Sequence, residues 1–404
     1  MNAVFAPSRP QGVVRVPASK SCAHRMLICA AFARGKSIIR DVSFSEDICA
    51  TMDCLKALGA KFFVDDSTIS VEGGLNANAS ENLPCRESGS TLRFLIPTAL
   101  LFGGGRFSGT KRLLDRGIGV YENLFAENAA FTRSSDTELQ VSGNLIANDW
   151  QVPGNVSSQF ISGLLFALPI LKDDSTLTII EPFESKGYVD LTVDALRQFG
   201  ICISREGNTF RIPGRQKYIP ADVQVEGDWS QAAFFEAMNV LGGSVELAGL
   251  NANSLQGDRI CVPLLDQISK GFVNADLSDY PDLAPVLFAS AAAFGHGAYF
   301  TGTRRLTIKE SNRATVMQAE LAKFGIQLQI EENAVKVLPG TLHAPAETLS
   351  GNNDHRIVMA LSVLAAKTGG SIRGAESVCK SYPDFFECLQ SLGIQVNLCK
   401  EDAR

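Results

Sequence analysis

The sequence lacks the features that mark several large classes of protein. Its ten cysteines fall at irregular spacings without a CxxC pair, so they support neither a zinc site nor the disulfide framework of a small secreted domain. No apolar run reaches the eighteen or so residues that a membrane span requires. The first residues have neither a cationic segment nor a long apolar segment of the kind found in secretory signals. We therefore expect a cytoplasmic protein with reduced, mostly buried thiols and no membrane partner.

Acidic residues slightly outnumber basic ones, 43 against 37. A formal net charge of −6 argues against nucleic acid or an anionic membrane surface as the main partner. A phosphate-binding P-loop is missing as well, although "AAFARGKS" resembles the end of one. Ala30 stands where that motif requires its first glycine, and the segment precedes a strand-like run instead of opening a helix. We reject an ATPase on these grounds, and any anion site must be local.

The chain of 404 residues, 45% hydrophobic and 20% charged, is long enough for two or three soluble domains. Four amphipathic stretches end in a glycine at the position where a helix terminus favours a left-handed residue. These are Gly59, Gly200, Gly325 and Gly393. The first three stretches continue into two short strands around a polar turn, and residues 131–144 predict a further, eroded hairpin. The repeat predicts an α/β fold of helix-plus-hairpin units in two domains.

Five polar residues, Asn352 to Arg356, immediately precede the apolar run 357–366. Helix capping explains one or two of them, because an Asn or Asp at the N-cap satisfies free backbone N–H groups. Capping does not explain Arg356, since a cation in the first turn is disfavoured by the helix dipole unless an anion binds there. This stretch therefore predicts an anion-binding site.

Three other helix starts combine small polar residues with a nearby cation or amide. They are Lys20, Ser21 and Arg25 in "PASKSCAHR", Ser88 to Thr91 with Arg93 in "ESGSTLR", and Ser157, Ser158 and Gln159 in "NVSSQF". Taken singly, each is explained equally well by a capped, buried helix. Two more segments add Ser185 and Tyr188 in "ESKGY", and Lys309, Glu310 and Arg313 in "TIKESNR", where the alternative is a solvated helix surface.

In order, the motifs PASKS…R, ESGSTLR, SSQF, SKGY, YPD, KESNR, NDHR and CKSYPDFFE resemble the 5-enolpyruvylshikimate-3-phosphate synthase family across roughly residues 15 to 390. The resemblance implies two similar domains, each built from three βαβαββ repeats in an inverse α/β barrel. It implies a first domain over residues 19–225 and a second over residues 1–18 plus 226–404, with the active site in the interdomain cleft. We expect a monomer.

The resemblance also implies the reaction. The family transfers the enolpyruvyl group of phosphoenolpyruvate to the 5-hydroxyl of shikimate 3-phosphate and releases phosphate, a step of chorismate and aromatic amino acid biosynthesis that glyphosate inhibits. Both substrates are polyanions, so the site must gather cations on an acidic protein. Neither a metal nor another cofactor is expected, because the enolpyruvyl group itself carries the reactivity.

Carried over by motif, the implied residues fall into three sets. Phosphoenolpyruvate is expected to meet Lys20, Gly89, Arg116, Gln159, Arg313, Arg356 and Lys380. Shikimate 3-phosphate is expected to meet Lys20, Ser21, Arg25, Ser157, Ser158, Gln159, Ser185, Tyr188, Asp282 and Lys309. Proton transfer is expected from Lys20, Asp282 and Glu310, with the division of roles left open.

Four positions depart from the family pattern: Glu87 and His24 stand where asparagine is common, and Gly117 and Gly187 stand where proline is common. Two alternatives remain. The related transferase that acts on UDP-N-acetylglucosamine usually carries a cysteine on a loop of its first domain, and the matching stretch "GTKRLLDRGIGV" has none. The other alternative is an anion-binding relative without catalytic activity, against which the presence of Lys20, Asp282 and Glu310 argues.

Overall fold

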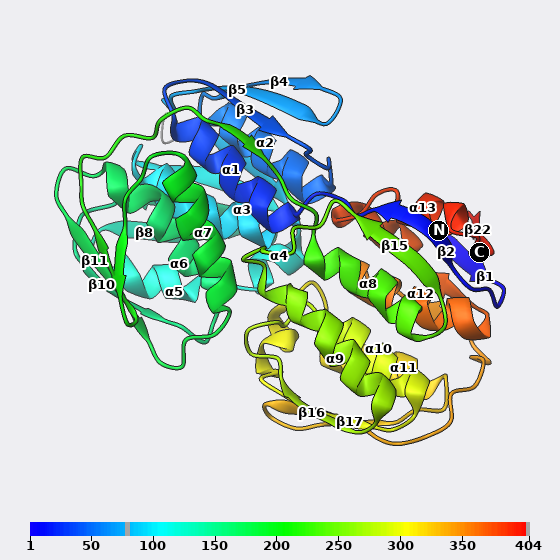
Figure 1. The fold of residues 1–404 in the computed structure, drawn as a ribbon. Coiled ribbons are helices and arrows are strands. Elements are labelled where there is room, and N and C mark those ends of the chain that lie inside the picture. The colour runs from blue at the N-terminus through cyan, green and yellow to red at the C-terminus, as the bar shows by residue number, and fades with distance from the viewer. Residues whose placement is uncertain (77–80, 401–404) are drawn as a thin grey trace. The chain divides into compact units, whose positions relative to one another are not determined.

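The computed structural model describes residues 1–76 and 81–400. The chain divides into two compact units. We call Ala18–Glu226 the inserted unit, and Met1–Pro17 together with Gly227–Arg404 the bipartite unit. Each unit has its own hydrophobic core. In the bipartite unit the two ends of the chain lie side by side, because β1 (Asn2–Phe5) pairs antiparallel with β22 (Val396–Cys399) (Figure 1).

The inserted unit contains three four-stranded sheets with one shared plan. In each, a parallel pair of strands is followed by an antiparallel hairpin. In spatial order the sheets are β14 (Asp222–Gln224), β3 (Gly35–Arg40), β5 (Thr68–Gly73), β4 (Lys61–Asp65); β6 (Asn82–Arg86), β7 (Gly104–Gly109), β9 (Glu138–Gly143), β8 (Ala129–Ser135); and β10 (Asp149–Pro153), β11 (Ser175–Ile180), β13 (Thr209–Ile212), β12 (Ser204–Glu206).

The bipartite unit repeats this plan in two of its described sheets, while its third described sheet is a single parallel pair, and the N-terminal strands take part in two of the three. β1 lies between β21 and β22, and β2 pairs parallel with β15. In spatial order the sheets are β16 (Val273–Asp276), β17 (Ala298–Thr301), β19 (Ala334–Val337), β18 (Leu328–Ile330); β20 (Leu349–Ser350), β21 (Gly370–Arg373), β1, β22; and the pair β15 (Ser244–Ala248), β2 (Gln11–Arg15).

In the part of the chain that the structure describes, six helices are buried on nearly all sides, because apolar residues extend well beyond a single stripe of each helix. In the inserted unit these are α1 (Lys20–Phe32), α3 (Gly89–Leu100) and α6 (Ser158–Ala167). In the bipartite unit they are α8 (Trp229–Val240), α10 (Ala284–Phe294) and α12 (His355–Thr368). Each unit therefore places three helices in its interior and its sheets outside them, as an inverse barrel requires.

The remaining helices are amphipathic or short. They are α2 (Glu46–Ala57), α4 (Lys111–Asp115), α5 (Gly119–Leu124), α7 (Lys186–Gln198), α9 (Cys261–Lys270), α11 (Arg313–Ala322) and α13 (Phe385–Ser391), with 3₁₀ turns η1 (Leu168–Ile170), η2 (Gly257–Ile260), η3 (Arg304–Ile308) and η4 (Ala375–Lys380). Among the residues described, no helix combines the length and apolarity needed to cross a membrane.

The predicted repeat is confirmed. Gly59, Gly200, Gly325 and Gly393 have φ of +105°, +79°, +85° and +83°, so each ends its helix in a conformation that glycine alone adopts easily. Hairpins follow the first three, and the eroded hairpin is β8–β9. The fourth helix, α13, leads into β22 alone, which takes β1 as its antiparallel partner. The α/β class with two units of three repeats is thus the observed fold.

Candidate active site

Several predicted site residues lie at the N-terminal ends of buried helices: Lys20 and Ser21 in α1, Gly89 in α3, Ser158 and Gln159 in α6, and Arg356 in α12. Ser19, Ser88 and Ser157 cap α1, α3 and α6, and Asp228 and Asp354 cap α8 and α12, each by accepting a hydrogen bond from a first-turn N–H group. None of these five described helices carries an acidic residue in its first turn. The positive ends of α1, α3 and α6 are therefore left for a ligand or a neighbouring side chain, while the carboxylates of Asp228 and Asp354 already face those of α8 and α12.

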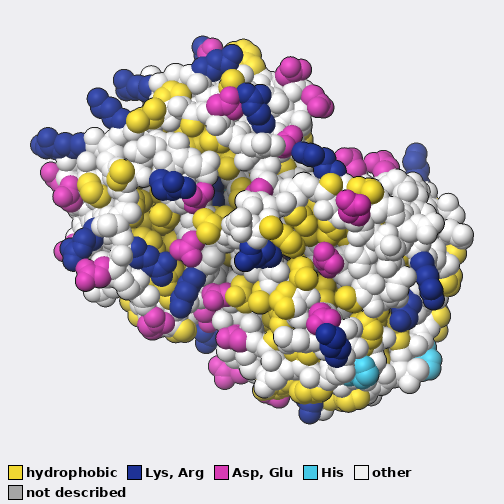
Figure 2. Space-filling model, viewed as in Figure 1, with side chains coloured by type: hydrophobic (Ala, Val, Ile, Leu, Met, Phe, Trp, Pro, Cys, Tyr) yellow, Lys and Arg dark blue, Asp and Glu magenta, His cyan; other side chains and the backbone are white. Residues whose placement is uncertain are grey.

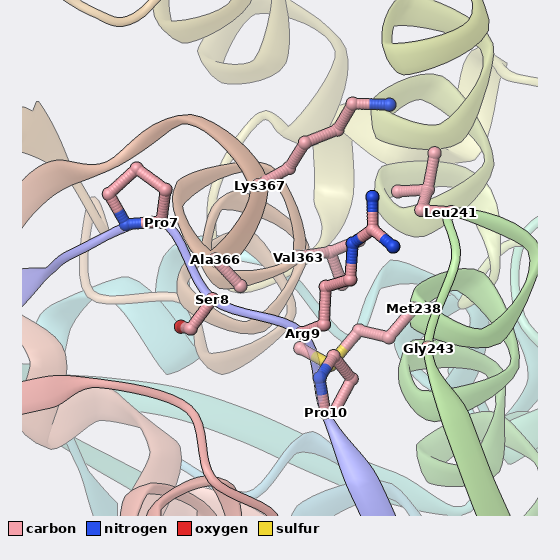
Figure 3. A pocket seen from close by; sticks show the side chains of 10 residues that line it. All are labelled: Pro7, Ser8, Arg9, Pro10, Met238, Leu241, Gly243, Val363, Ala366 and Lys367. Carbon is pink, nitrogen blue, oxygen red and sulfur yellow. The ribbon is translucent and has the colours of Figure 1, made fainter.

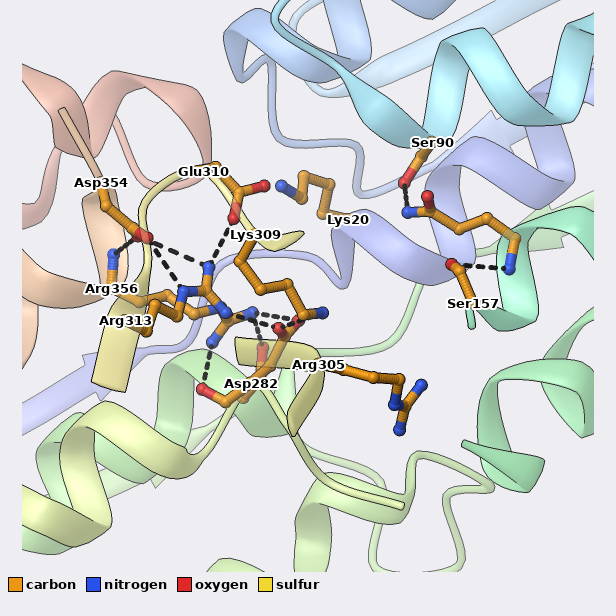
Figure 4. A network of polar contacts seen from close by, with 12 residues as sticks. Lys20, Ser90, Ser157, Asp282, Arg305, Lys309, Glu310, Arg313, Asp354 and Arg356 are labelled. Atoms are coloured by element: carbon orange, nitrogen blue, oxygen red, sulfur yellow. Dashed lines mark hydrogen bonds and ion pairs between the residues drawn. The ribbon is translucent and has the colours of Figure 1, made fainter. Parts of the chain in front are cut away.

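In the bipartite unit, Arg313 is the centre of a polar cluster (Figure 4). Its Nε donates to Asp354 Oδ2 at 2.9 Å, Nη1 donates to Asp282 Oδ1 at 2.8 Å, and Nη2 donates to Glu310 Oε2 at 2.7 Å. Its side chain is only 1% exposed. One guanidinium therefore holds three carboxylates, among them both proposed proton-transfer carboxylates, in a fixed arrangement.

Asp282 lies among three cations. Besides Arg313, its carboxylate contacts Lys309 Nζ at 3.1 Å and Arg356 Nη2 at 3.1 Å. Burial by itself would raise the pKa of Asp282, but Arg356, Lys309 and Arg313 together hold that pKa well below its ordinary value. Burial also lowers the pKa of Lys309, against the opposing effect of Asp282. Asp282 is therefore an ionised carboxylate whose charge is already compensated.

In the polar stretch before α12, Asn352, Asn353, Asp354 and Arg356 each have a structural role. Asn352 and Asn353 have φ of +48° and +52°, a left-handed conformation that asparagine tolerates. This turn aims the Asn353 carbonyl at Lys380 Nζ, 2.6 Å away. Asp354 then caps the helix, and Arg356 donates to Ser230 Oγ at 2.9 Å, which joins the starts of α12 and α8. The stretch thus brings Arg356 and Lys380 to the same end of the unit.

In the inserted unit, Gln159 joins the starts of α3 and α6. Its amide nitrogen donates to Ser90 Oγ at 3.0 Å, and its carbonyl oxygen accepts from Arg93 Nη1 at 2.7 Å. Arg93 also donates to the backbone oxygens of Arg116 and Gly117 and is 3% exposed. Arg93 therefore supports the loop that carries Arg116.

Gly89 begins α3 directly beside Arg116. A Cβ at position 89 would lie 2.9–3.1 Å from the Arg116 guanidinium, closer than side chains pack. Gly117 has φ +74°, which proline cannot adopt. Position 117 departs from the family pattern because the backbone conformation of this loop excludes proline and favours glycine.

Arg25 is buried and engaged within the unit. Its Nε donates to Thr192 Oγ1 at 2.8 Å, and its Nη atoms donate to the backbone oxygens of Ser21 and Tyr188. Burial lowers the pKa of Arg25 to about 10. The side chain therefore ties α1 to α7, while its contact with shikimate 3-phosphate stays a prediction. At the start of α7, Ser185 is buried and left-handed, with φ +57°.

Lys20, in the first turn of α1, pairs with Asp47 of α2 through an Nζ–Oδ2 contact of 2.7 Å. Both side chains are largely shielded, with 17% and 14% of their surface exposed.

Sequence reasoning missed Asp47, because an acid in the first turn of a helix is typical of capping. It also missed Ser230 and the link from Asp354 to Arg313, since neither has a local sequence signal. Ser157 caps α6, which begins at the buried Ser158.

A separate pocket of about 400 Å³ lies in the bipartite unit (Figure 3). Met238, Val363 and Ala366 line it together with Arg9 and Lys367. It sits at the C-terminal ends of α8 and α12, whereas Ser230 and Arg356 lie at their N-terminal ends. The 14-residue α12 alone separates the two by about 20 Å. This pocket is therefore not part of the cluster.

On the face drawn in Figure 2, basic and acidic side chains are interspersed.

Comparison with known proteins gives one consistent result. The family model described as EPSP synthase (3-phosphoshikimate 1-carboxyvinyltransferase) matches residues 4–389. The chain is 40% identical to the 3-phosphoshikimate 1-carboxyvinyltransferase of Clostridium kluyveri, covering 97% of each chain. It is 38% identical to that of Clostridium acetobutylicum, covering 98% of this chain and 99% of the relative.

Solved structures agree on the fold. An EPSP synthase from Acinetobacter baumannii superposes with a TM-score of 0.78 at 23% identity, covering 99% of this chain and 100% of that one. The enolpyruvyl transferase NikO from Streptomyces tendae superposes with a TM-score of 0.79 at 16% identity, covering 98% of both chains.

Proposed function

The chain belongs to the EPSP synthase (3-phosphoshikimate 1-carboxyvinyltransferase) family, and on that premise we propose which residues carry out its reaction. The enzyme transfers the enolpyruvyl group of phosphoenolpyruvate to the 5-hydroxyl of shikimate 3-phosphate in aromatic amino acid biosynthesis. The related transferase for UDP-N-acetylglucosamine is not favoured, since the family model and the relatives agree on the shikimate enzyme.

The reaction is an addition followed by an elimination, and protons are transferred in both steps. In the addition, an acid protonates the methylene carbon of phosphoenolpyruvate, and the 5-hydroxyl oxygen bonds to the adjacent carbon as a base takes its proton. The tetrahedral intermediate then loses phosphate by cleavage of the carbon–oxygen bond, and the new methyl group returns a proton to restore the double bond. We assign these transfers to Asp282 and Glu310, with Lys20 able to share either.

The observation that carries this assignment is the shared guanidinium of Arg313. It donates to Asp282 Oδ1 and to Glu310 Oε2 at 2.8 Å and 2.7 Å, which fixes the two carboxylates relative to each other. A pair of carboxylates positioned by one buried cation suits an acid–base pair acting on adjacent atoms. We propose that Arg313 holds the two carboxylates in place and also binds phosphoenolpyruvate.

The charges around Asp282 suggest how substrate binding makes it a base. While Arg356, Lys309 and Arg313 face this carboxylate, its pKa stays well below the ordinary value and it takes up a proton poorly. A phosphate or carboxylate that draws those cations away weakens that effect, so the pKa of Asp282 rises. The polyanionic substrates themselves therefore prepare Asp282 to accept the proton of the 5-hydroxyl.

The two substrates bind residues of both units, some of which also take part in proton transfer. We propose that phosphoenolpyruvate binds Lys20, Gly89, Arg116, Gln159, Arg313, Arg356 and Lys380. We propose that shikimate 3-phosphate binds Lys20, Ser21, Arg25, Ser157, Ser158, Gln159, Ser185, Tyr188, Asp282 and Lys309. The N-terminal ends of the buried helices support both sets, because backbone N–H groups there are oriented for anions. We further propose that the enzyme is cytoplasmic and works as a monomer. Gel filtration at several protein concentrations tests the oligomeric state.

The decisive experiment is phosphate release from the purified chain. With phosphoenolpyruvate and shikimate 3-phosphate together, phosphate is expected to appear, and neither substrate alone should release it. Release with UDP-N-acetylglucosamine in place of shikimate 3-phosphate would support the related transferase instead. Binding of both anions without phosphate release would identify an inactive relative. Mass spectrometry of the product, which gains an enolpyruvyl group, completes the test.

A further inference from the structure

A buried chain of hydrogen bonds runs from α1 through α2 to the start of α3 in the inserted unit. His24 Nδ1 contacts Thr51 Oγ1 at 2.7 Å, and Thr51 Oγ1 contacts Thr91 Oγ1 at 2.6 Å. Thr91 Oγ1 in turn donates to Ser88 Oγ at 2.7 Å. All four side chains are at most 1% exposed. These contacts are therefore shielded from bulk solvent, and each depends on the next.

Counting protons fixes the direction of the chain. Each hydroxyl has one proton to donate. Thr91 gives its proton to Ser88, so Thr51 must give its own to Thr91. Thr51 then has no proton left for the imidazole, and His24 Nδ1 must be the donor in their contact. The ring consequently carries its proton on Nδ1, and Nε2 has a free lone pair.

The surroundings of the ring agree with a neutral imidazole. Burial lowers the pKa of His24 well below its ordinary value, and the charges of Lys20 and Arg25 lower it further. Within residues 1–76 and 81–400, the buried Nε2 has no hydrogen-bond partner. The ring packs edge-on against Phe94, with centroids 6.3 Å apart. A proton on Nε2 would be a buried, uncompensated donor, which is costly.

The chain of hydrogen bonds ends at Ser88, the N-cap residue of α3. Ser88 Oγ accepts both the Thr91 hydroxyl and, at 3.2 Å, the Thr91 backbone N–H. The next residues are Gly89, beside Arg116, and Ser90, which accepts from Gln159. A shift of the Ser88 cap would therefore move groups that the proposed function assigns to phosphoenolpyruvate.

We infer that His24 is a positioning residue for phosphoenolpyruvate: as the Nδ1–H tautomer it directs a one-way chain of three hydroxyls that fixes the first turn of α3. The inference rests on the proposed function for the identity of the ligand, but the tautomer does not. Hydrogen bonds in such chains strengthen one another, so removing the first donor weakens all of them.

Four variants test the role. In His24→Asn the amide nitrogen stands as many bonds from the backbone as Nδ1, so it can still donate to Thr51. In His24→Gln the amide is one carbon further out, in the place of Nε2, and His24→Phe has no donor. Thr51→Val breaks the chain at its second member without changing His24.

We expect His24→Asn to keep the KM for phosphoenolpyruvate within about threefold of the original value. The Gln, Phe and Val variants should raise that KM about tenfold, the effect of one lost hydrogen bond of about 1.4 kcal/mol, with the KM for shikimate 3-phosphate changing far less. His24→Phe combined with Thr51→Val should cost little more than either alone. Equal changes in both KM values, or Gln matching Asn, would overturn the inference.

The ¹⁵N resonances of the imidazole test the tautomer in the unaltered protein and need no activity. We expect a protonated Nδ1 and an unprotonated Nε2 at neutral pH, with the signals identified by their loss in His24→Asn. An Nε2–H tautomer or a charged ring would overturn the inference even if phosphate release succeeds. If phosphate release fails but the Nδ1–H tautomer is found, the proposed function is what has failed.

Discussion

Asp354 Oδ2 accepts a hydrogen bond from Arg313 Nε at 2.9 Å, and the two side chains are 0% and 1% exposed. Asp354 also caps α12 through the Arg356 N–H group. One carboxylate therefore both starts the helix that carries Arg356 and orients the guanidinium that holds Asp282 and Glu310. This makes Asp354 a structural support for the proposed chemistry.

Asp354→Asn separates its two functions, because asparagine caps helices about as well as aspartate but carries no charge. We expect the free energy of unfolding to fall by about 2 kcal/mol, the value of a hydrogen bond to a charged group. Asp354→Ala should cost about 1 kcal/mol more, since the cap is lost too. Urea unfolding followed by fluorescence measures both. Equal stability of the Asn variant and the original would show that Arg313 does not depend on Asp354.

Glu310→Gln keeps the shape of the side chain and removes its charge and basicity. We expect kcat to fall at least about 100-fold, the usual contribution of a proton-transfer group, while the Kd for shikimate 3-phosphate changes less than about threefold. Stopped-flow phosphate release and calorimetric titration provide the two numbers. Glu332→Gln, an exposed change in the same unit, is the matched control. A parallel loss of turnover and affinity would make Glu310 a structural residue.

Local patterns in the sequence predicted the repeat well. Each terminal glycine reflects a backbone requirement within a few residues, and the following hairpins alternate on the same short scale. The N-cap serines at 19, 88 and 157 are local in the same sense. For this reason the sequence alone predicts the helix starts, and with them most of the candidate residues.

Partners distant in the chain were not visible. Arg25 contacts Thr192, 167 positions away, and Lys20 contacts Asp47, which reads in the sequence as an ordinary helix-start acid. Arg93 has the motif position of an anion-binding cation, but the structure turns it toward Gln159 and two backbone oxygens. Folding decides which cations are used internally, because their carbonyl and carboxylate partners come together only in three dimensions.

Gly89→Ala should change inhibitor sensitivity more than substrate binding. The added methyl would lie about 3 Å from the Arg116 guanidinium, which must move away. Glyphosate, which is longer than phosphoenolpyruvate, should tolerate the narrowed space less. We expect the inhibition constant of glyphosate to rise about tenfold or more, corresponding to at least 1.4 kcal/mol, and the KM for phosphoenolpyruvate to rise less.

Inhibition titrations against phosphoenolpyruvate on both proteins check this. Gly119→Ala is the matched control, because Gly119 also begins a helix and its added Cβ would meet only a Glu122 oxygen at 3.7 Å. An original protein already indifferent to glyphosate, or an Ala variant equally inhibited, would show that Gly89 does not line the inhibitor's site.

The neutral state of His24 makes the stability of the protein dependent on pH in a defined direction. The pKa of His24 in the folded protein lies well below 6.5 because the ring is buried, with Lys20 and Arg25 lowering it further. The groups that face the ring from α2 and α3, Thr51 and Phe94, do not titrate. In the unfolded chain the imidazole regains its ordinary pKa of about 6.5 and takes up a proton below that pH.

The resulting contribution is present above about pH 6.5 and is lost as the pH falls toward the lower pKa of the folded state, by up to about 1.4 kcal/mol per pH unit. His24→Asn removes the titrating group while keeping a donor for Thr51, so its free energy of unfolding should fall less than that of the original protein between about pH 7 and pH 5. Urea unfolding at closely spaced pH values measures the difference in slope. His296→Asn makes the same replacement at an exposed position and is the matched control. Identical slopes for His24→Asn and the original protein would mean that the ring at position 24 takes up its proton equally easily in the folded and unfolded chains, and so is not held neutral by the fold.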